Sequence, residues 1–106
     1  MSDVKIEKRI EVSVVFVQYN PDLTKILLSL YALIHQKEIS FEIIVSDDGS
    51  KEDYFEEIER FFKNNDFSNY YLRKNHQNVG IVKNILLASE IANGRYIYIN
   101  SPGDVL

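Results

Sequence analysis

The sequence contains no cysteine and no tryptophan, and only four glycines and two prolines in 106 residues. The absence of cysteine excludes disulfide frameworks, thiolate zinc sites and thiol nucleophiles, so the fold depends on its hydrophobic core. The chain also lacks a run of basic residues, and its 12 Lys+Arg against 16 Asp+Glu give a formal net charge of −4. Because a nucleic-acid-binding protein needs clustered cations to neutralise phosphates, we expect no nucleic-acid partner.

Long hydrophobic runs are missing as well. No stretch approaches the roughly 18 consecutive apolar residues that a membrane-spanning helix requires. The first nine residues are rich in charge, where a signal peptide would have an apolar segment. The hydrophobic fraction of 45% is ordinary for a folded domain, and a chain of this length forms one domain or part of one. We therefore expect residues 1–106 to form a single cytoplasmic domain with no membrane span.

Four short apolar stretches predict β-strands. Residues 12–19 are β-branched and apolar without a helical period, which is typical of a strand buried on both faces of a parallel sheet. Similar stretches predict strands over residues 41–46, 70–72 and 96–99.

Amphipathic stretches between these strands predict three helices. The first is expected to begin with Asn20 as its N-cap and Pro21 as its first helical residue. Ser50 and Asp53 resemble a capping box that opens the second helix. The third is expected to end at Gly94, in the left-handed conformation that terminates many helices.

This βαβαβαβ alternation predicts a Rossmann-like α/β fold with a mostly parallel sheet and helices on both faces. In such a sheet the carboxyl ends of the strands share one edge, and ligands bind there, where the strand order reverses. The unusual polar residues of this chain follow the strand ends, at positions 19–20, 47–50, 74–78 and 100–104. The sequence therefore predicts a ligand site at this edge.

Asp47 and Asp48 are the strongest candidate feature at these strand ends. They precede Gly49 and Ser50, and this composition is that of an ordinary turn. Two adjacent carboxylates repel each other, however, and a turn needs only one of them. The functional interpretation is that one carboxylate accepts hydrogen bonds from the N–H or hydroxyl groups of a ligand. Both interpretations stay open on the sequence pattern alone.

Other polar positions also admit two interpretations. Tyr19 is either an amphipathic core aromatic or a ring on which a base stacks. Asn78 and Lys83 belong to a polar helix start, which suits either ordinary capping or an anion. The two histidines, His35 and His76, are interpreted as structural or solvated.

The motifs of several enzyme classes are missing. The sequence has no Gly-x-x-x-x-Gly-Lys-Ser/Thr, Gly-x-Gly-x-x-Gly, Gly-x-Ser-x-Gly or His-Glu-x-x-His. A receiver-like phosphoacceptor domain would use the acidic pair but needs another Asp at a neighbouring strand end, and the third strand ends in Arg73-Lys74-Asn75.

Four segments, taken together and in order, resemble the family-2 glycosyltransferases of the GT-A fold. They are residues 12–20 (VSVVFVQYN), 42–50 (EIIVSDDGS), 78–84 (NVGIVKN) and 94–97 (GRYI). The resemblance covers nearly the whole chain from about Glu11 onward. It implies that the chain is the N-terminal, nucleotide-binding half of a larger GT-A domain.

The resemblance also implies roles for individual residues. Tyr19 would stack on or flank the uracil of a UDP-sugar, and one of the two adjacent aspartates, which we assign as Asp48, would hydrogen-bond the base. Asn78, Lys83 and Ser101 would contribute to donor binding, with Lys83 toward the diphosphate. The family has arginine at the position that we align with Lys83, and lysine lacks the guanidinium fork, so this contact is expected to be looser.

The segment after the fourth strand departs from the family's pattern. The family usually has an Asp-x-Asp-type motif there, whose acids hold a divalent ion against the donor diphosphate. Residues 101–104 read SPGD in this chain, so Asp104 is the one acid that remains as a metal ligand. A single carboxylate can hold Mg²⁺ or Mn²⁺ when phosphates and waters complete the coordination, so we expect poor affinity for the cation without nucleotide.

The resemblance finally implies an inverting glycosyltransferase that moves a sugar from a nucleotide donor, UDP-linked by our assignment, to a saccharide or lipid-linked acceptor in polysaccharide biosynthesis. Members of the family place the acceptor site and the catalytic base after the metal motif. We therefore assign no catalytic base and expect this chain alone to be inactive. The alternative is a non-catalytic nucleotide-binding or self-associating module, because an unpaired sheet edge favours homo-oligomers.

Overall fold

The computed structural model describes residues 9–36 and 39–103. In chain order the elements are β1 (Val12–Gln18), α1 (Leu23–Ile34), β2 (Phe41–Asp47), α2 (Phe55–Asn64), β3 (Tyr70–Lys74), α3 (Ile81–Ser89) and β4 (Tyr96–Asn100). This order confirms the predicted alternation of strands and helices. The first strand stops one residue earlier than predicted, and the other three continue one or two residues further.

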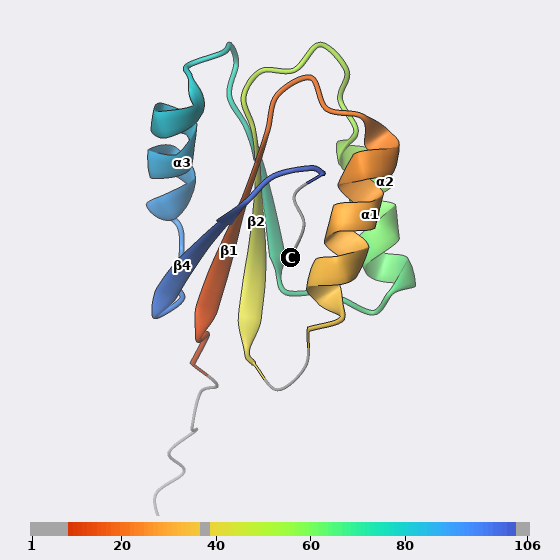
Figure 1. Cartoon of the computed structure of the whole chain (residues 1–106), viewed down its shortest axis with the longest axis vertical. Coiled ribbons are helices and arrows are strands. Elements are labelled where there is room, and N and C mark those ends of the chain that lie inside the picture. Colours follow the sequence, from red (N-terminus) through yellow and green to blue (C-terminus); the bar gives the residue numbers. More distant parts are fainter. Residues whose placement is uncertain (1–8, 37–38, 104–106) are drawn as a thin grey trace, which may run out of the picture.

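The four strands form one parallel sheet in the order β3-β2-β1-β4. The chain steps outward from β1 to β2 and β3, and then crosses back to place β4 on the other side of β1. The strand order therefore reverses between β1 and β4. Helices α1 and α2 cover one face of the sheet and α3 covers the other (Figure 1). The Rossmann-like α/β prediction is confirmed.

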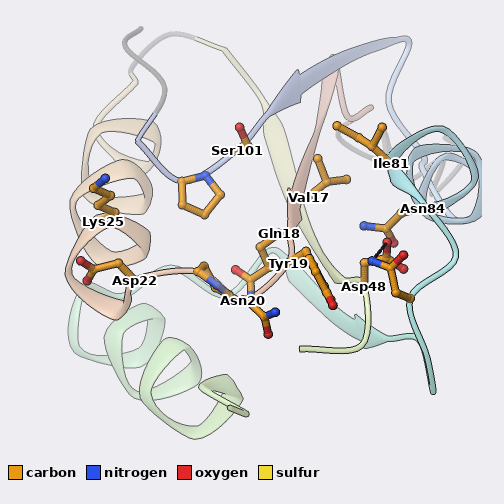
Figure 2. Close-up of a pocket in the computed structure, with 13 residues that line it drawn as sticks. Val17, Gln18, Tyr19, Asn20, Asp22, Lys25, Asp48, Ile81, Asn84 and Ser101 are labelled. Carbon is orange, nitrogen blue, oxygen red and sulfur yellow. Dashed lines mark hydrogen bonds between the residues drawn. The ribbon is translucent and has the colours of Figure 1, made fainter. Parts of the chain in front are cut away.

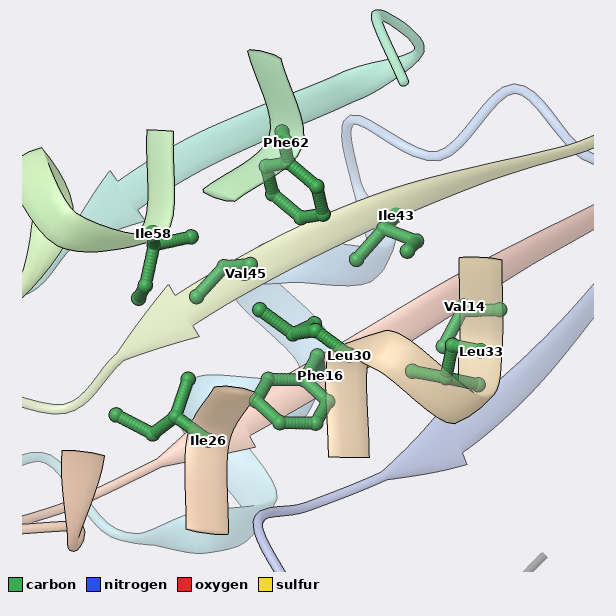
Figure 3. Close-up of a cluster of buried hydrophobic side chains, with 9 residues drawn as sticks. All are labelled: Val14, Phe16, Ile26, Leu30, Leu33, Ile43, Val45, Ile58 and Phe62. Carbon is green, nitrogen blue, oxygen red and sulfur yellow. The ribbon is translucent and has the colours of Figure 1, made fainter. Parts of the chain in front are cut away.

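The larger part of the core lies between the sheet and helices α1 and α2 (Figure 3). Alternate residues of the two central strands point into it and meet apolar side chains of both helices: Val14, Phe16, Ile26, Leu30, Leu33, Ile43, Val45, Ile58 and Phe62. The intervening strand residues Val15, Val17 and Ile44 pack with Ala88 of α3 on the other face. Both faces of β1 and β2 are thus covered, which explains their uninterrupted apolar sequences.

The predicted start of α1 was wrong. The helix begins two residues beyond the predicted proline, and Asp22 is its N-cap, with a carboxylate that accepts a hydrogen bond from the Thr24 N–H (2.8 Å). Asn20 instead has a φ of 47°, in the left-handed region that asparagine tolerates. Its N–H donates to Ser50 Oγ (2.7 Å), and its Oδ1 accepts from the Lys51 N–H (3.0 Å). Asn20 therefore joins the loops that follow β1 and β2.

The predicted capping box of α2 was also wrong. The helix begins at Phe55, whose N–H donates to Asp53 Oδ1 (2.9 Å). The Ser50 hydroxyl donates to Asp47 Oδ1 (2.7 Å) and so belongs to the turn after β2. The two residues serve separate turns because the chain does not become helical until Phe55.

Gly94 is a glycine for a different reason from the one predicted. Helix α3 already ends at Ser89, and the glycines with positive φ do not include Gly94. A Cβ at this position would lie 2.4 Å from the Ser13 nitrogen, so only glycine lets the loop pass against β1. The Gly94 N–H donates to Ser13 Oγ (2.7 Å), and the Ser13 hydroxyl donates to the buried Glu42 carboxylate (2.6 Å). Glu42 also accepts from the Asn93 N–H (2.7 Å), which fixes this loop to the sheet.

Candidate functional site

A cavity of about 570 Å³ opens at the carboxyl ends of β1 and β4, where the strand order reverses (Figure 2). Its volume is within the range of small-molecule sites. The loop after β1, the start of α1, the turn after β2, the start of α3 and the turn after β4 form its walls. The lining residues are Val17, Gln18, Tyr19, Asn20, Pro21, Asp22, Lys25, Asp48, Asn78, Ile81, Asn84, Ser101 and Pro102. This is the edge at which the sequence predicts a ligand site.

The structure brings four of the predicted site residues together in this cavity, namely Tyr19, Asp48, Asn78 and Ser101. Tyr19 is 52% exposed, so its ring is available to a ligand at the cavity. Lys83 is exposed on α3 and is not among the lining residues. Asp104 lies outside the described residues.

Asp48 is buried, and its carboxylate holds the loop that precedes α3. Oδ1 accepts hydrogen bonds from Asn75 Nδ2 (3.0 Å) and the Val79 N–H (2.8 Å), and Oδ2 accepts from Asn78 Nδ2 (3.0 Å) and the Gly80 N–H (3.0 Å). An ionised carboxylate has about four acceptor sites, so these bonds use its capacity. The negative charge also lies at the N-terminus of α3, where the helix dipole favours it.

Asp47 is the acid of the turn after β2. Its Oδ1 accepts from Gln18 Nε2 (3.0 Å) and the Ser50 hydroxyl (2.7 Å), and its Oδ2 accepts from the Ser50 N–H (2.8 Å). Ser50 Oγ in turn accepts from the Asn20 N–H. The residues on both sides of Tyr19 are therefore fixed to the same turn, and Asp47 itself does not line the cavity.

A second polar network joins β2, β3 and α3 and contacts Asp48 through Asn75. Arg73 donates from Nη1 to Ser46 Oγ (2.6 Å) and from Nη2 to Asn75 Oδ1 (2.7 Å). Asn84 donates from Nδ2 to the Ser46 carbonyl (3.0 Å), and its Oδ1 accepts from the Ser46 hydroxyl (2.6 Å). Arg73 is thus linked through Asn75 to the Asp48 carboxylate. Arg73 and Asn75 were not among the predicted site residues, although their polar side chains at the end of β3 were a signal for such a role.

Two buried amide oxygens among the described residues have no hydrogen-bond partner, Gln18 Oε1 and Asn100 Oδ1. Buried polar atoms are usually paired, so these two are exceptions. They belong to the carboxyl ends of β1 and β4, the two strands between which the order reverses. The unmet hydrogen-bonding capacity is therefore concentrated at this switch point.

The described part of the chain does not supply an acidic metal site. Within residues 9–36 and 39–103, no group of three or more His, Cys, Asp or Glu side chains could hold a metal ion. The turn after β4 contributes Ser101, Pro102 and Gly103, none of which has a carboxylate, and the Asp48 oxygens already accept four hydrogen bonds. None of these described residues therefore provides an acid for an Asp-x-Asp-type site, and Asp104, the predicted metal ligand, lies outside them.

None of the helices in the described ranges is both long and apolar enough to cross a membrane.

Comparison with solved structures shows the same fold in TarS from S. aureus. Residues 1–349 of TarS superpose with a TM-score of 0.74 and 24% identity, over 89% of this chain and 28% of that one. The same region of TarS in complex with UDP-GlcNAc gives 0.70 and 25%, over 87% and 26% of the two chains. A further TarS structure gives 0.65 and 26%, over 87% and 16%. The chain thus spans less than a third of the length of these relatives.

The search of curated proteins gives no match. The sequence model described as glycosyl transferase family 2 matches residues 13–100, which include the three helices and four strands described above apart from Val12, the first residue of β1. Of the four segments on which the resemblance rests, the match covers three completely and the first, residues 12–20, apart from Val12. The chain belongs to glycosyl transferase family 2.

Proposed function

We propose that the cavity binds the nucleotide part of a UDP-sugar donor. The observation that carries this proposal is the convergence of Tyr19, Asp48 and Asn78 from three separate loops at the strand-order reversal. Family membership supports a nucleotide-sugar glycosyltransferase, and the TarS structure with UDP-GlcNAc supports a uridine nucleotide as the ligand.

Each of these residues has a distinct part in the proposed complex. The half-exposed ring of Tyr19 stacks on the base, and such stacking contributes roughly 1–3 kcal/mol. Asp48 accepts from the base N–H, for which one of its present donors must leave. Among the residues that donate to Asp48, Asn78 is the exposed one. Its amide can therefore give up the bond to Asp48 Oδ2 as the base enters.

We further propose an inverting transfer in which an acceptor hydroxyl oxygen attacks C1 of the sugar. The C1–oxygen bond to the diphosphate breaks and UDP leaves with the electron pair, while a base takes the hydroxyl proton. We assign this base and the acceptor site, for a saccharide or a lipid-linked acceptor, to a portion of a larger domain of which this chain is the donor half. The chain covers 28% of the TarS 1–349 chain, which supports that division. We place the reaction in the cytoplasm, as the sequence analysis predicts.

Nuclear magnetic resonance of the ¹⁵N-labelled chain tests the location of the donor. Titration with UDP should shift the amide signals of Tyr19, Val79 and Gly80, which belong to the cavity or to the loop that Asp48 holds. The amides of Asn93 and Gly94 lie at the opposite edge of the sheet and should not move. Shifts confined to that opposite edge, or none at saturating UDP, would contradict the proposal.

Self-association is a second candidate function, and β4 supports it. Four consecutive residues of this strand are between 42% and 57% exposed, and all are large and apolar or aromatic: Tyr96, Ile97, Tyr98 and Ile99. In the described part of the chain β4 pairs with β1 alone, so its other edge is unpaired, and such edges join other strands. Sedimentation equilibrium should show a concentration-dependent dimer that Ile97→Lys weakens. A monomer throughout the concentration range would reject this candidate.

A further inference from the structure

Lys25 lies at the opposite end of the cavity from Asp48. It belongs to the first turn of α1, and Figure 2 shows it on that helix, with Asp48 and Asn84 across the cavity and Ser101 between the two ends. Lys25 is exposed and makes no ion pair with another residue of the described ranges. Of the lining residues it is the one with a positive charge.

The stem of Lys25 also lies beside the turn that follows β4. Lys25 Cδ is 3.7 Å from the position that a Cβ on Gly103 would occupy. The Gly103 N–H donates to Ser29 Oγ (2.9 Å), one helical turn further along α1. Helix α1 therefore holds this turn in place and brings a lysine to it. In sequence, the segment after β4 keeps one acid, Asp104, of the motif with which family members hold a cation.

Neither of the two acidic side chains that line the cavity forms an ion pair with this lysine in the described ranges. Asp48 already accepts four hydrogen bonds at the far end, and Asp22 accepts from the Thr24 N–H as the cap of α1. Lys83, the lysine for which the sequence suggests a diphosphate contact, is on the exposed side of α3 and outside the lining.

From these positions we infer that Lys25 binds the diphosphate of the donor and supplies positive charge where the acidic metal motif is reduced. This inference rests on the proposed function, since it takes a nucleotide whose base is held by Tyr19 and Asp48. A lysine ammonium is a compact cation with three donors, and it binds phosphate as a point charge without fixed geometry. UDP bound in this way keeps its affinity when divalent cations are removed.

Calorimetric titration of the 106-residue chain with uridine and with UDP tests the inference, because uridine has the base and ribose but no phosphate. The variants are Lys25→Met, Lys25→Arg and Lys83→Met, and Lys63→Met on α2 is the matched control, since Lys63 is an exposed lysine paired only with Glu59 (3.9 Å). Lys25→Met should weaken UDP about tenfold, as expected for a charge-assisted hydrogen bond, and leave uridine unchanged. Lys25→Arg should keep most of the affinity.

The salt dependence gives a second measure of the same contact. UDP affinity of the wild type should fall as salt increases, and that dependence should be reduced in Lys25→Met but not in Lys63→Met. Chelation of divalent ions with EDTA should leave UDP binding intact.

The remaining outcomes distinguish a failure of the Lys25 contact from a failure of nucleotide binding as a whole. If Lys25→Met binds UDP as the wild type does, or if Lys83→Met alone shows the loss, the inference is overturned while the proposed function stands. Equal losses for uridine and UDP in Lys25→Met would also overturn it, because the effect would then not lie in the phosphates. A wild type that binds neither ligand would overturn the proposed function itself.

Discussion

Replacement of Asp48 by asparagine tests whether one carboxylate organises the site. The substitution converts one of the two oxygens into an NH₂ group, which then faces two donors from the loop before α3. Either Asn75 Nδ2 and the Val79 N–H, or Asn78 Nδ2 and the Gly80 N–H, lose their acceptor. At about 1–3 kcal/mol for each of the two donors left without a partner, the loss of unfolding free energy is about 2–6 kcal/mol. That is a large fraction of the roughly 5–15 kcal/mol that a small domain has.

Urea unfolding followed by circular dichroism measures this loss. The midpoint should fall while the slope stays constant, because the surface exposed on unfolding is unchanged. Hydrogen exchange should become faster at the Val79 and Gly80 amides. Asp53→Asn is the matched control, since Asp53 is exposed and an asparagine oxygen can keep its bond from the Phe55 N–H. The ion pair with Lys74 (4.0 Å) that it loses is solvent-exposed, and such pairs contribute little. A change below about 0.5 kcal/mol for Asp48→Asn, equal to that of the control, would refute this reasoning.

Three other changes follow from contacts described above, together with one titration. Gly94→Ala forces a Cβ against β1 and should cost about 1–3 kcal/mol in thermal unfolding, and an unchanged melting temperature would argue against that close approach. Glu42→Gln removes charge from a buried acceptor of several hydrogen bonds and should destabilise by about 1–3 kcal/mol, as measured by urea unfolding. Tyr19→Ala should weaken uridine binding about tenfold in calorimetry, whereas Tyr19→Phe keeps the ring and the affinity. Burial, and secondarily the hydrogen bond to Glu59, raise the pKa of Tyr70 above its usual 10.0, so absorbance titration of Glu59→Gln should show a lower pKa for this tyrosine than in the wild type.

Much of the fold could be predicted from hydrophobic period alone. The strands β1 and β2 are covered on both faces, so their apolar residues are continuous, and the helices show one apolar side each. The predictions that were wrong concern the residues at which the helices start and end. Asn20 and Ser50 have the composition of caps, but Asn20 bonds to Ser50 across loops that are 30 residues apart in sequence, and Ser50 bonds to Asp47 in its own turn. Local patterns do not reveal such partners.

The position of the site could be predicted from the sequence better than its hydrogen bonds and its full set of lining residues. Strand ends of a parallel sheet share an edge, so Tyr19, Asp48 and Asn78 could be expected together there. The number of donors to Asp48 could not be expected, because it depends on how the backbone of residues 75–80 turns back toward β2. Lys25 was not assigned to the site because it belongs to an amphipathic helix, where an exposed lysine is ordinary. Its importance depends on the turn after β4 packing against that helix.

Calorimetric titration of the chain with UDP, GDP and dTDP, each with and without Mn²⁺, tests the central claim most directly. The account predicts that UDP binds selectively at the switch-point cavity and that its affinity persists without Mn²⁺. Binding of none of the three nucleotides by the folded chain would contradict it.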